Sequence, residues 1–175
     1  MNNLDYQVVI WLNDLAGKSD FLNALLFGLN KISLVLFGLV LVFYFFKNRK
    51  IFWTGLFSTI LARGVLTELI RFLIPRPRPF IALENVKKLV KQNPLEPSFP
   101  SGHAALMFAI AFTVSLFNKK IGGILIVVAL ILSLIRVYAG VHYPSDILGG
   151  IIVAGTSVYL AQKFIRRRTD RETNG

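Results

Sequence analysis

The chain of 175 residues contains no cysteine, and it has only two histidines and nine acidic residues against twenty lysines and arginines. The lack of cysteine excludes disulfides and thiolate metal sites, so thiols reveal nothing about the redox compartment. The formal net charge is +11, but the basic residues lie mostly at the ends of apolar runs and form no stripe with interleaved aromatics. This distribution argues against nucleic acid as a partner.

Long apolar runs make up most of the sequence. Hydrophobic residues make up 54% of the chain, 15 residues are phenylalanine, and the mean hydropathy is +0.60. A soluble domain of this size is less apolar, so the composition predicts an all-α, polytopic membrane helix bundle in one domain, residues 1–175. Because about 20 helical residues cross a hydrocarbon core, we expect five spans: Phe21–Phe46, Ile51–Ile74, Ser101–Phe117, Ile121–Tyr138 and Asp146–Ile165.

Residues 1–18 predict an amphipathic helix at the membrane interface, because apolar residues recur at helical spacing while Asp5 and Asn13 lie elsewhere. The segment lacks the basic stretch and small-residue cleavage site of a cleaved signal peptide. Lys31 inside the first apolar run leaves a sixth, shorter span open, so the expected number is five to six. The recurring apolar residues are Leu4, Val8, Trp11, Leu12 and Leu15.

Basic residues in short connectors predict the orientation, because cytoplasmic loops carry the excess of lysine and arginine. With five spans, successive connectors lie on alternating sides of the membrane. Three basic regions then share the cytoplasmic side of the inner (plasma) membrane: residues 47–50, residues 119–120 and the tail 166–175. The connector 75–100 and the turn 139–145 then share the outer, periplasmic or extracellular face. The connector 75–100 is itself basic, and binding of an anion at the outer face would explain those charges.

Three arginines lie at the end of the second expected span, in the sequence TELIRFLIPRPRPF. Arg71 and Arg78 are seven residues apart, and Arg76 lies between them in a segment that prolines, Pro79 among them, make rigid. A single arginine at a helix end most often reaches toward lipid head groups. Three arginines on a rigid backbone favour phosphate instead, because a guanidinium pairs with two phosphate oxygens at once.

The third expected span begins in the sequence SFPSGHA, which contains the first histidine, His103. A helix N-terminus offers free N–H groups and a partial positive charge to an anion. Gly102 permits close approach, and the Ser101 hydroxyl is a further donor. Taken alone, Pro100 and Ser101 are ordinary residues at a helix start and His103 is a structural histidine.

The second histidine lies in the sequence RVYAGVHYPSD, where Arg136, His142 and Asp146 are spaced by six and four residues. Pro144 suits the first position of the fifth helix, which places Asp146 in its first turn and within reach of His142. A carboxylate on one ring nitrogen fixes the tautomer and leaves the other nitrogen free as a nucleophile or base. The alternatives are a pair that only caps the helix and a divalent metal site, which the arginines would repel.

Both histidines and the arginines fall at one predicted membrane face. This combination suits phosphoryl transfer without a metal or other cofactor. Arginines and helix N–H groups neutralise the phosphate oxygens, one histidine attacks phosphorus, and the other protonates the leaving oxygen.

These residues resemble the type 2 phosphatidic acid phosphatase superfamily, a group of membrane lipid phosphatases related to vanadium haloperoxidases. The family has three motifs: a lysine, six residues and Arg-Pro; Pro-Ser-Gly-His; and Ser-Arg, five residues, His, three residues and Asp. The corresponding residues here are Arg71 with Arg78 and Pro79, Pro100 to His103, and Arg136 with His142 and Asp146.

The resemblance implies that His142 is the nucleophile and forms a phosphohistidine, that Asp146 orients it, and that His103 is the general acid. The implied phosphate ligands are Arg71, Arg78, Ser101, the Gly102 amide and Arg136.

The sequence departs from the family pattern at two positions. Arg71 replaces the lysine, and a planar guanidinium reaches a phosphate differently from an ammonium group. Ile135 replaces the serine of the third motif and removes a hydroxyl. Glu68 lies one turn before Arg71 and is a candidate to orient it, although Arg63 competes for the same carboxylate.

The activity that the resemblance implies is removal of a terminal phosphate from a lipid phosphate or diphosphate. The small size of the chain and the sequence SFPSGHA favour undecaprenyl diphosphate. Phosphatidylglycerol phosphate, phosphatidic acid and the 1-phosphate of lipid A are alternatives, because the site residues contact the phosphate and not the lipid. A transporter of anionic lipids and a vanadate haloperoxidase are the alternatives from other classes. The sequence does not indicate an oligomeric state.

Overall fold

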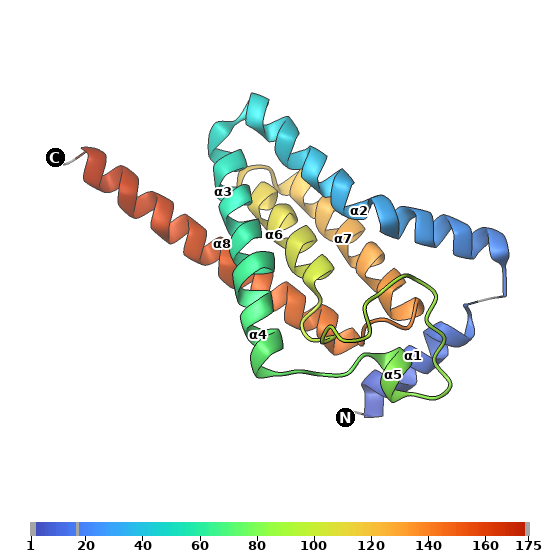
Figure 1. Cartoon of the computed structure of the whole chain (residues 1–175). Coiled ribbons are helices and arrows are strands. Elements are labelled where there is room, and N and C mark those ends of the chain that lie inside the picture. The colour runs from blue at the N-terminus through green and yellow to red at the C-terminus, as the bar shows by residue number, and fades with distance from the viewer. Residues whose placement is uncertain (1–2, 17, 174–175) are drawn as a thin grey trace.

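The computed structural model describes residues 3–16 and 18–173, and over these residues the chain is helical without strands (Figure 1). A π-helical segment, η1, joins α3 to α4. The helices are α1 (Asn3–Asp14), α2 (Asp20–Lys47), α3 (Arg49–Thr59), η1 (Ile60–Leu66), α4 (Thr67–Leu73), α5 (Pro79–Ala82), α6 (Gly102–Phe117), α7 (Lys119–Tyr138) and α8 (Pro144–Thr173).

Three of these helices are long and apolar enough to cross a membrane, namely Asn23–Lys47 within α2, the whole of α7, and Pro144–Ile165 within α8. Helix α6 is apolar but shorter, with 16 residues. Helix α2 continues through Lys31 without a break, so the first apolar run forms one helix. The all-α membrane architecture is therefore confirmed, whereas the number of five to six spans stays a prediction.

The basic tail expected at 166–175 continues α8 as far as Thr173, and residues 174–175 lie outside the described residues. Side chains in this tail are not described beyond Ile165. The second expected span corresponds to α3, η1 and α4, which follow one another without a gap from Arg49 to Leu73. Asn48 caps its start, because its side chain accepts hydrogen bonds from the backbone N–H groups of Lys50 and Ile51.

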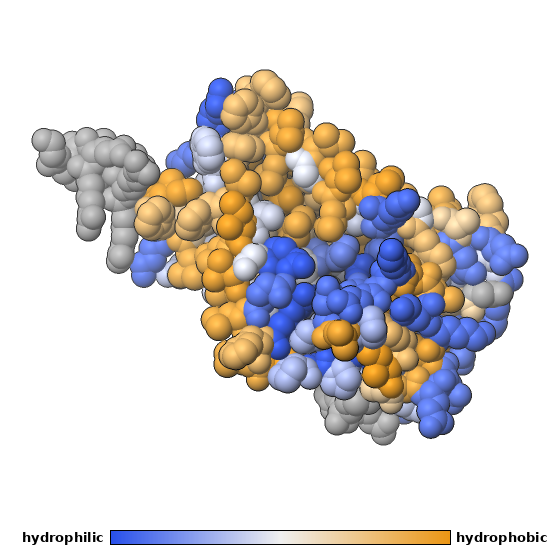
Figure 2. All heavy atoms as spheres, viewed as in Figure 1, coloured by the Kyte–Doolittle hydropathy of each residue, from blue (hydrophilic) through white to orange (hydrophobic). Residues whose placement is uncertain are grey.

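Helix α6 is the centre of the bundle and packs against α3, α7 and α8. Small side chains permit this close packing, since Ala104, Ala105 and Ala109 are fully buried. Gly150 of α8 lies directly against α6, where an added Cβ would be 2.8 Å from the Cβ of Ala104. Apolar residues cover the outer sides of the helices, whereas polar residues gather at the end of the bundle that carries the connector (Figure 2). The face in view therefore combines an apolar surface along the helices with a polar cluster at the connector.

The connector between α4 and α6 folds back across this polar end. Backbone hydrogen bonds join it to the turn between α7 and α8, from Phe80 N to Gly140 O (3.2 Å) and from Leu89 N to Ala139 O (3.2 Å). Within the connector, Ser98 N donates to Arg76 O (2.8 Å). The connector is therefore held over the ends of the helices that carry the two histidines.

Helix α1 lies against the same end of the bundle (Figure 1). The buried side chain of Asn13 donates to the carbonyl oxygens of Lys87 (3.0 Å) and Tyr138 (2.9 Å) and accepts from Lys87 N (2.7 Å). Asp5 is also buried, whereas Leu4 and Trp11 are 70% and 64% exposed. Asp5 and Asn13 thus face the protein, whereas Leu4 and Trp11 face outward.

Gly140 of the turn between α7 and α8 is the position where the backbone requires glycine. Its φ is +73°, and an added Cβ would lie 2.5 Å from Lys87 O. Gly140→Ala is expected to destabilise the fold by about 1–2 kcal/mol from the left-handed φ alone and to lower the thermal midpoint in detergent.

The matched control is Gly123→Ala in α7, where no atom lies within 4 Å of the added Cβ. This control is expected to hold or raise the midpoint, because alanine is the better helix former. A Gly140→Ala midpoint equal to that of the wild type would contradict the assigned turn conformation.

Candidate active site

The residues that the motifs single out come together at the polar end of the bundle from five segments. They lie in α4, the connector, the first turn of α6, the last turn of α7, and the turn that leads into α8: Arg71, Arg78, Ser101, Gly102, His103, Arg136, His142 and Asp146.

His142 and Asp146 form the predicted pair in the interior of the protein. His142 Nδ1 lies 3.2 Å from Asp146 Oδ2, and the two residues are 1% and 0% exposed. Helix α8 begins at Pro144, so Asp146 lies in its first turn, where it also accepts from Tyr143 N (2.8 Å). Because a carboxylate only accepts, Nδ1 carries the proton of the neutral ring. The lone pair of the ring is then on Nε2.

The electrostatic surroundings keep the His142 ring neutral. Burial lowers the pKa of His142 well below 6.5, and the nearby positive charges of Arg136, Arg78 and Arg71 lower this pKa further. A neutral imidazole retains the Nε2 lone pair at physiological pH. The site therefore holds a neutral histidine whose Nε2 lone pair is not protonated.

Arg78 lies next to this lone pair, with Nη1 3.5 Å from His142 Nε2. Its side chain is held by the carbonyl oxygens of Glu96 (2.9 Å), Val141 (3.0 Å) and Pro97 (3.2 Å). Burial lowers the pKa of Arg78 to about 10, with repulsion from Arg71 adding to the effect. The guanidinium therefore remains charged at neutral pH. Pro79, which follows Arg78, is the first residue of α5.

Arg71 is fixed by two contacts, one of them with Glu68, its predicted partner. Its Nη1 donates to Glu68 Oε1 (3.2 Å), and its Nε lies 3.4 Å from Pro100 O. Arg63 in η1 contacts the same Glu68 oxygen, so the two arginines share one carboxylate. Arg63 also lies beside Gly102, where an added Cβ would be 2.6 Å from Arg63 Nε. Glycine is needed here for the approach of this arginine.

Ser101 caps α6 and ties it to α8. Its Oγ accepts from Ala104 N (3.5 Å), and its backbone N donates to Asp146 O (2.9 Å). As an acceptor in the cap, the hydroxyl keeps its own hydrogen for a substrate. The amides of Gly102 and His103 lie in the first turn, where no intrahelical partner exists.

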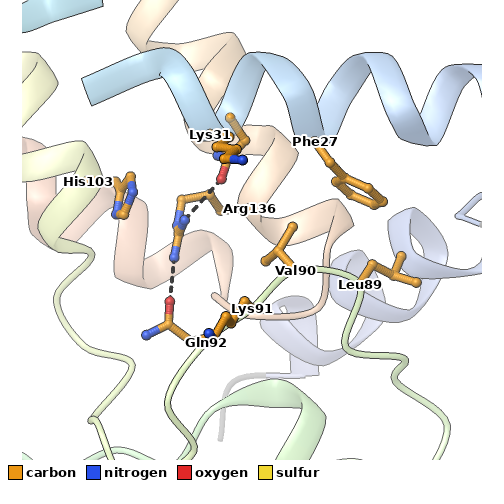
Figure 3. Close-up of a pocket in the computed structure, with 9 residues that line it drawn as sticks. Phe27, Lys31, Leu89, Val90, Lys91, Gln92, His103 and Arg136 are labelled. Atoms are coloured by element: carbon orange, nitrogen blue, oxygen red, sulfur yellow. Dashed lines mark hydrogen bonds between the residues drawn. The ribbon is translucent and has the colours of Figure 1, made fainter. Parts of the chain in front are cut away.

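Arg136 and His103 line a cavity of about 500 Å³ at this end of the bundle (Figure 3). Arg136 is 4% exposed, and it donates to the side-chain oxygens of Asn30 (3.2 Å) and Gln92 (2.9 Å). The other residues that line the cavity are Phe27, Asn30, Lys31, Leu89, Val90, Lys91 and Gln92.

Arg76, the third arginine of the segment 71–78, pairs with two carboxylates. Its guanidinium donates to Asp146 Oδ1 (2.9 Å) and to Asp5 Oδ2 (2.9 Å), and it stacks on the Tyr143 ring at 3.8 Å. Ser145 N also donates to Asp5 (3.0 Å). Arg76 therefore fixes Asp146, and Asp146 in turn fixes the His142 ring.

Asp5 is the residue that sequence reasoning missed, because no local pattern connects α1 with a residue 71 positions away. Burial raises the pKa of Asp5, but hydrogen bonds from Ser145 and Arg76 and the charge of Arg76 outweigh it, so this pKa falls below 3.8. Asp5 is therefore ionised and paired at neutral pH. The described residues contain no group of three or more histidine, cysteine or acidic residues that could hold a metal ion.

A buried histidine paired with a carboxylate lies among buried guanidinium groups at the polar end of an apolar helix bundle, an arrangement that fits a membrane phosphatase. The model of the PAP2 superfamily matches residues 52–170, and the chain belongs to that superfamily. The resemblance seen in the three motifs is thereby confirmed.

Two curated relatives match most of the chain. One is "Bacitracin transport permease protein BcrC" of Bacillus licheniformis, 31% identical over 87% of this chain and 76% of the relative. The other is "Undecaprenyl-diphosphatase BcrC" of Bacillus subtilis, 28% identical over 92% of this chain and 84% of the relative.

Two crystal structures have the same fold. LpxE of Aquifex aeolicus is 29% identical, with a TM-score of 0.76 over 90% of this chain and 93% of that chain. A PAP2-type phosphatidylglycerolphosphate phosphatase of Bacillus subtilis is 23% identical, with a TM-score of 0.67 over 93% and 85% of the two chains. The second comparison shows the shared fold alone.

The contact between α1 and Arg76 gives a prediction for activity. Asp5→Asn removes the charge that fixes Arg76 against Asp146, and kcat is expected to fall about tenfold, the equivalent of one hydrogen bond to a charged group. Phosphate release by purified protein in detergent measures this effect. The matched control is Asp14→Asn, since Asp14 is exposed on the same helix. Equal kcat values for Asp5→Asn and Asp14→Asn would show that α1 does not position the site.

Proposed function

We propose that the protein is an integral membrane phosphatase that removes the terminal phosphate of undecaprenyl diphosphate at the outer face of the plasma (inner) membrane. The observation that carries the proposal is the neutral, buried His142, held by Asp146 and facing Arg78. The name of the Bacillus subtilis relative, undecaprenyl-diphosphatase, supports the choice of substrate. Phosphatidylglycerol phosphate, phosphatidic acid and lipid A 1-phosphate are the alternative substrates.

The reaction proceeds in two displacements. Nε2 of His142 attacks the terminal phosphorus, a P–N bond forms, and the bond from phosphorus to the bridging oxygen breaks. His103 donates its proton to that oxygen as the lipid monophosphate leaves. His103 then takes a proton from water, the water oxygen attacks the phosphohistidine, and the P–N bond breaks to release inorganic phosphate. Asp146 holds the Nδ1 proton throughout and stabilises the charge that develops on the ring.

The arginines and the start of α6 hold the terminal phosphate during both displacements. Arg78 lies beside the attacking nitrogen, and Arg71 keeps Nη2 available while Glu68 and Pro100 hold its other nitrogens. The Ser101 hydroxyl and the Gly102 amide complete the set with Arg136. Charge on the transferred phosphoryl group spreads over its three oxygens, and fixed donors stabilise it without reorganisation. No step requires a metal ion or other cofactor.

Transport of an anionic lipid is the non-enzymatic alternative, and the name of the Bacillus licheniformis relative points in that direction. A transporter uses arginines at one membrane face but has no use for a neutral histidine fixed by a carboxylate. His142→Ala is therefore expected to lower the rate of phosphate release by about a thousandfold or more, because the proposed nucleophile is lost.

The measurement is phosphate release from lipids in detergent, beside the thermal midpoint and the binding of undecaprenyl diphosphate. A His142→Ala protein that binds the lipid with a wild-type midpoint and releases no phosphate fits the account. A variant that keeps most of its phosphatase activity would refute the role of His142.

Five spans fit the structure better than six. Helix α1 has 12 residues and is about 18 Å long, too short for a hydrocarbon core of about 30 Å. Asn13 also binds α1 to the connector and to the end of α7. This contact supports the proposal that α1 lies at the outer face and does not cross the membrane. The five proposed spans are then α2, the run Arg49–Leu73, α6, α7 and α8.

The orientation is testable because the chain has no cysteine. Glu84→Cys in the connector and Lys120→Cys at the start of α7 both replace exposed residues. A membrane-impermeant maleimide is expected to label Glu84→Cys in intact cells and Lys120→Cys only after permeabilisation, because the two sites lie on opposite faces. Labelling of Lys120→Cys alone in intact cells would reverse the proposed orientation.

A further inference from the structure

The cavity beside Arg136 is lined by polar groups that lack an acceptor within the described part of the chain (Figure 3). Arg136 Nε and Asn30 Nδ2 are buried without a hydrogen-bond partner among the described residues. The two residues are 4% and 6% exposed, and both line the cavity. A buried donor without an acceptor costs about 1–3 kcal/mol. Such donors indicate that a ligand supplies the missing oxygens.

Two lysines give the cavity a positive charge. Lys31 of α2 and Lys91 of the connector line it, and neither has an ion-pair partner within the described part of the chain. Both are exposed, so they are accessible to a ligand. Phe27, Leu89 and Val90 supply an apolar wall on the same cavity. The lining therefore matches an anion that is joined to an apolar chain.

The position of His103 decides which part of the substrate enters this cavity. His103 lines the cavity, and in the proposed reaction it protonates the oxygen of the leaving group. The leaving group must therefore lie on the cavity side of the transferred phosphorus. In a lipid diphosphate this leaving group is the lipid monophosphate, which carries negative charge of its own.

We propose that the cavity is a second phosphate site, which binds the phosphate that stays on the lipid. The inference rests on the proposed function. A second phosphate site would explain why the enzyme prefers diphosphates to monoesters. Arg136 bridges the two sites, and Asn30, Lys31 and Lys91 hold the second phosphate. These charges stabilise the lipid monophosphate as the bridging P–O bond breaks and His103 transfers its proton. A monoester leaves the lysines without a partner.

The test compares Lys31→Met and Lys91→Met with the control Lys47→Met, at the far end of α2. For each variant, kcat/KM is measured on undecaprenyl diphosphate and on phosphatidic acid. The diphosphate-to-monoester ratio of kcat/KM is expected to fall about tenfold for either cavity variant, because one charge-assisted contact is lost. The ratio of the control variant is expected to stay that of the wild type.

Product inhibition gives a second measurement. Undecaprenyl monophosphate is expected to inhibit the wild type competitively, and Lys31→Met is expected to weaken this inhibition about tenfold for the same reason. Inhibition by inorganic phosphate, which binds the first site, is expected to keep its wild-type strength.

Unchanged ratios in both cavity variants, with a wild type that hydrolyses the diphosphate, would overturn the second site and leave the proposed function intact. A wild type that hydrolyses monoesters and not the diphosphate would overturn both.

Discussion

Burial of guanidinium groups at one end of the bundle is the constraint on which the rest of this structure depends. Arg78 and Arg136 are nearly inaccessible to solvent, and a buried charge is costly unless hydrogen bonds compensate it. For Arg78 the acceptors are backbone carbonyls of the connector and of the turn before His142. The connector must therefore fold back over the helix ends. Its path forms the polar end of the bundle and one wall of the cavity.

A chain of charged contacts links α1 to His142. Asp5 holds Arg76, Arg76 holds Asp146, and Asp146 holds His142. Each carboxylate along this chain is buried and paired, which fixes the imidazole tautomer without an exposed ion pair that solvent would weaken. The N-terminal helix thus contributes to the site although it lies outside the region that the superfamily model matches, residues 52–170.

The sequence predicts those contacts of the site that join residues close together in the chain. His142 and Asp146 are only four residues apart, and Pro144 marks the start of α8 between them, so the chain brings the two side chains within reach locally. The contacts of Arg136 with Asn30 and of Arg76 with Asp5 span 106 and 71 residues and depend on how the helices pack, which no spacing encodes. The same limit applies to Lys31. In the sequence it suggests a helix break, whereas in the fold it lines the cavity.

The central claim is a covalent phosphoryl group on His142, and it is tested by rapid mixing with undecaprenyl diphosphate that carries ³²P in its terminal phosphate. With EDTA present and quenching in alkali, the account predicts a label on the peptide that contains His142. A phosphohistidine label is stable in base and lost in acid. Steady phosphate release without any such label, or a label on another residue, would contradict the account.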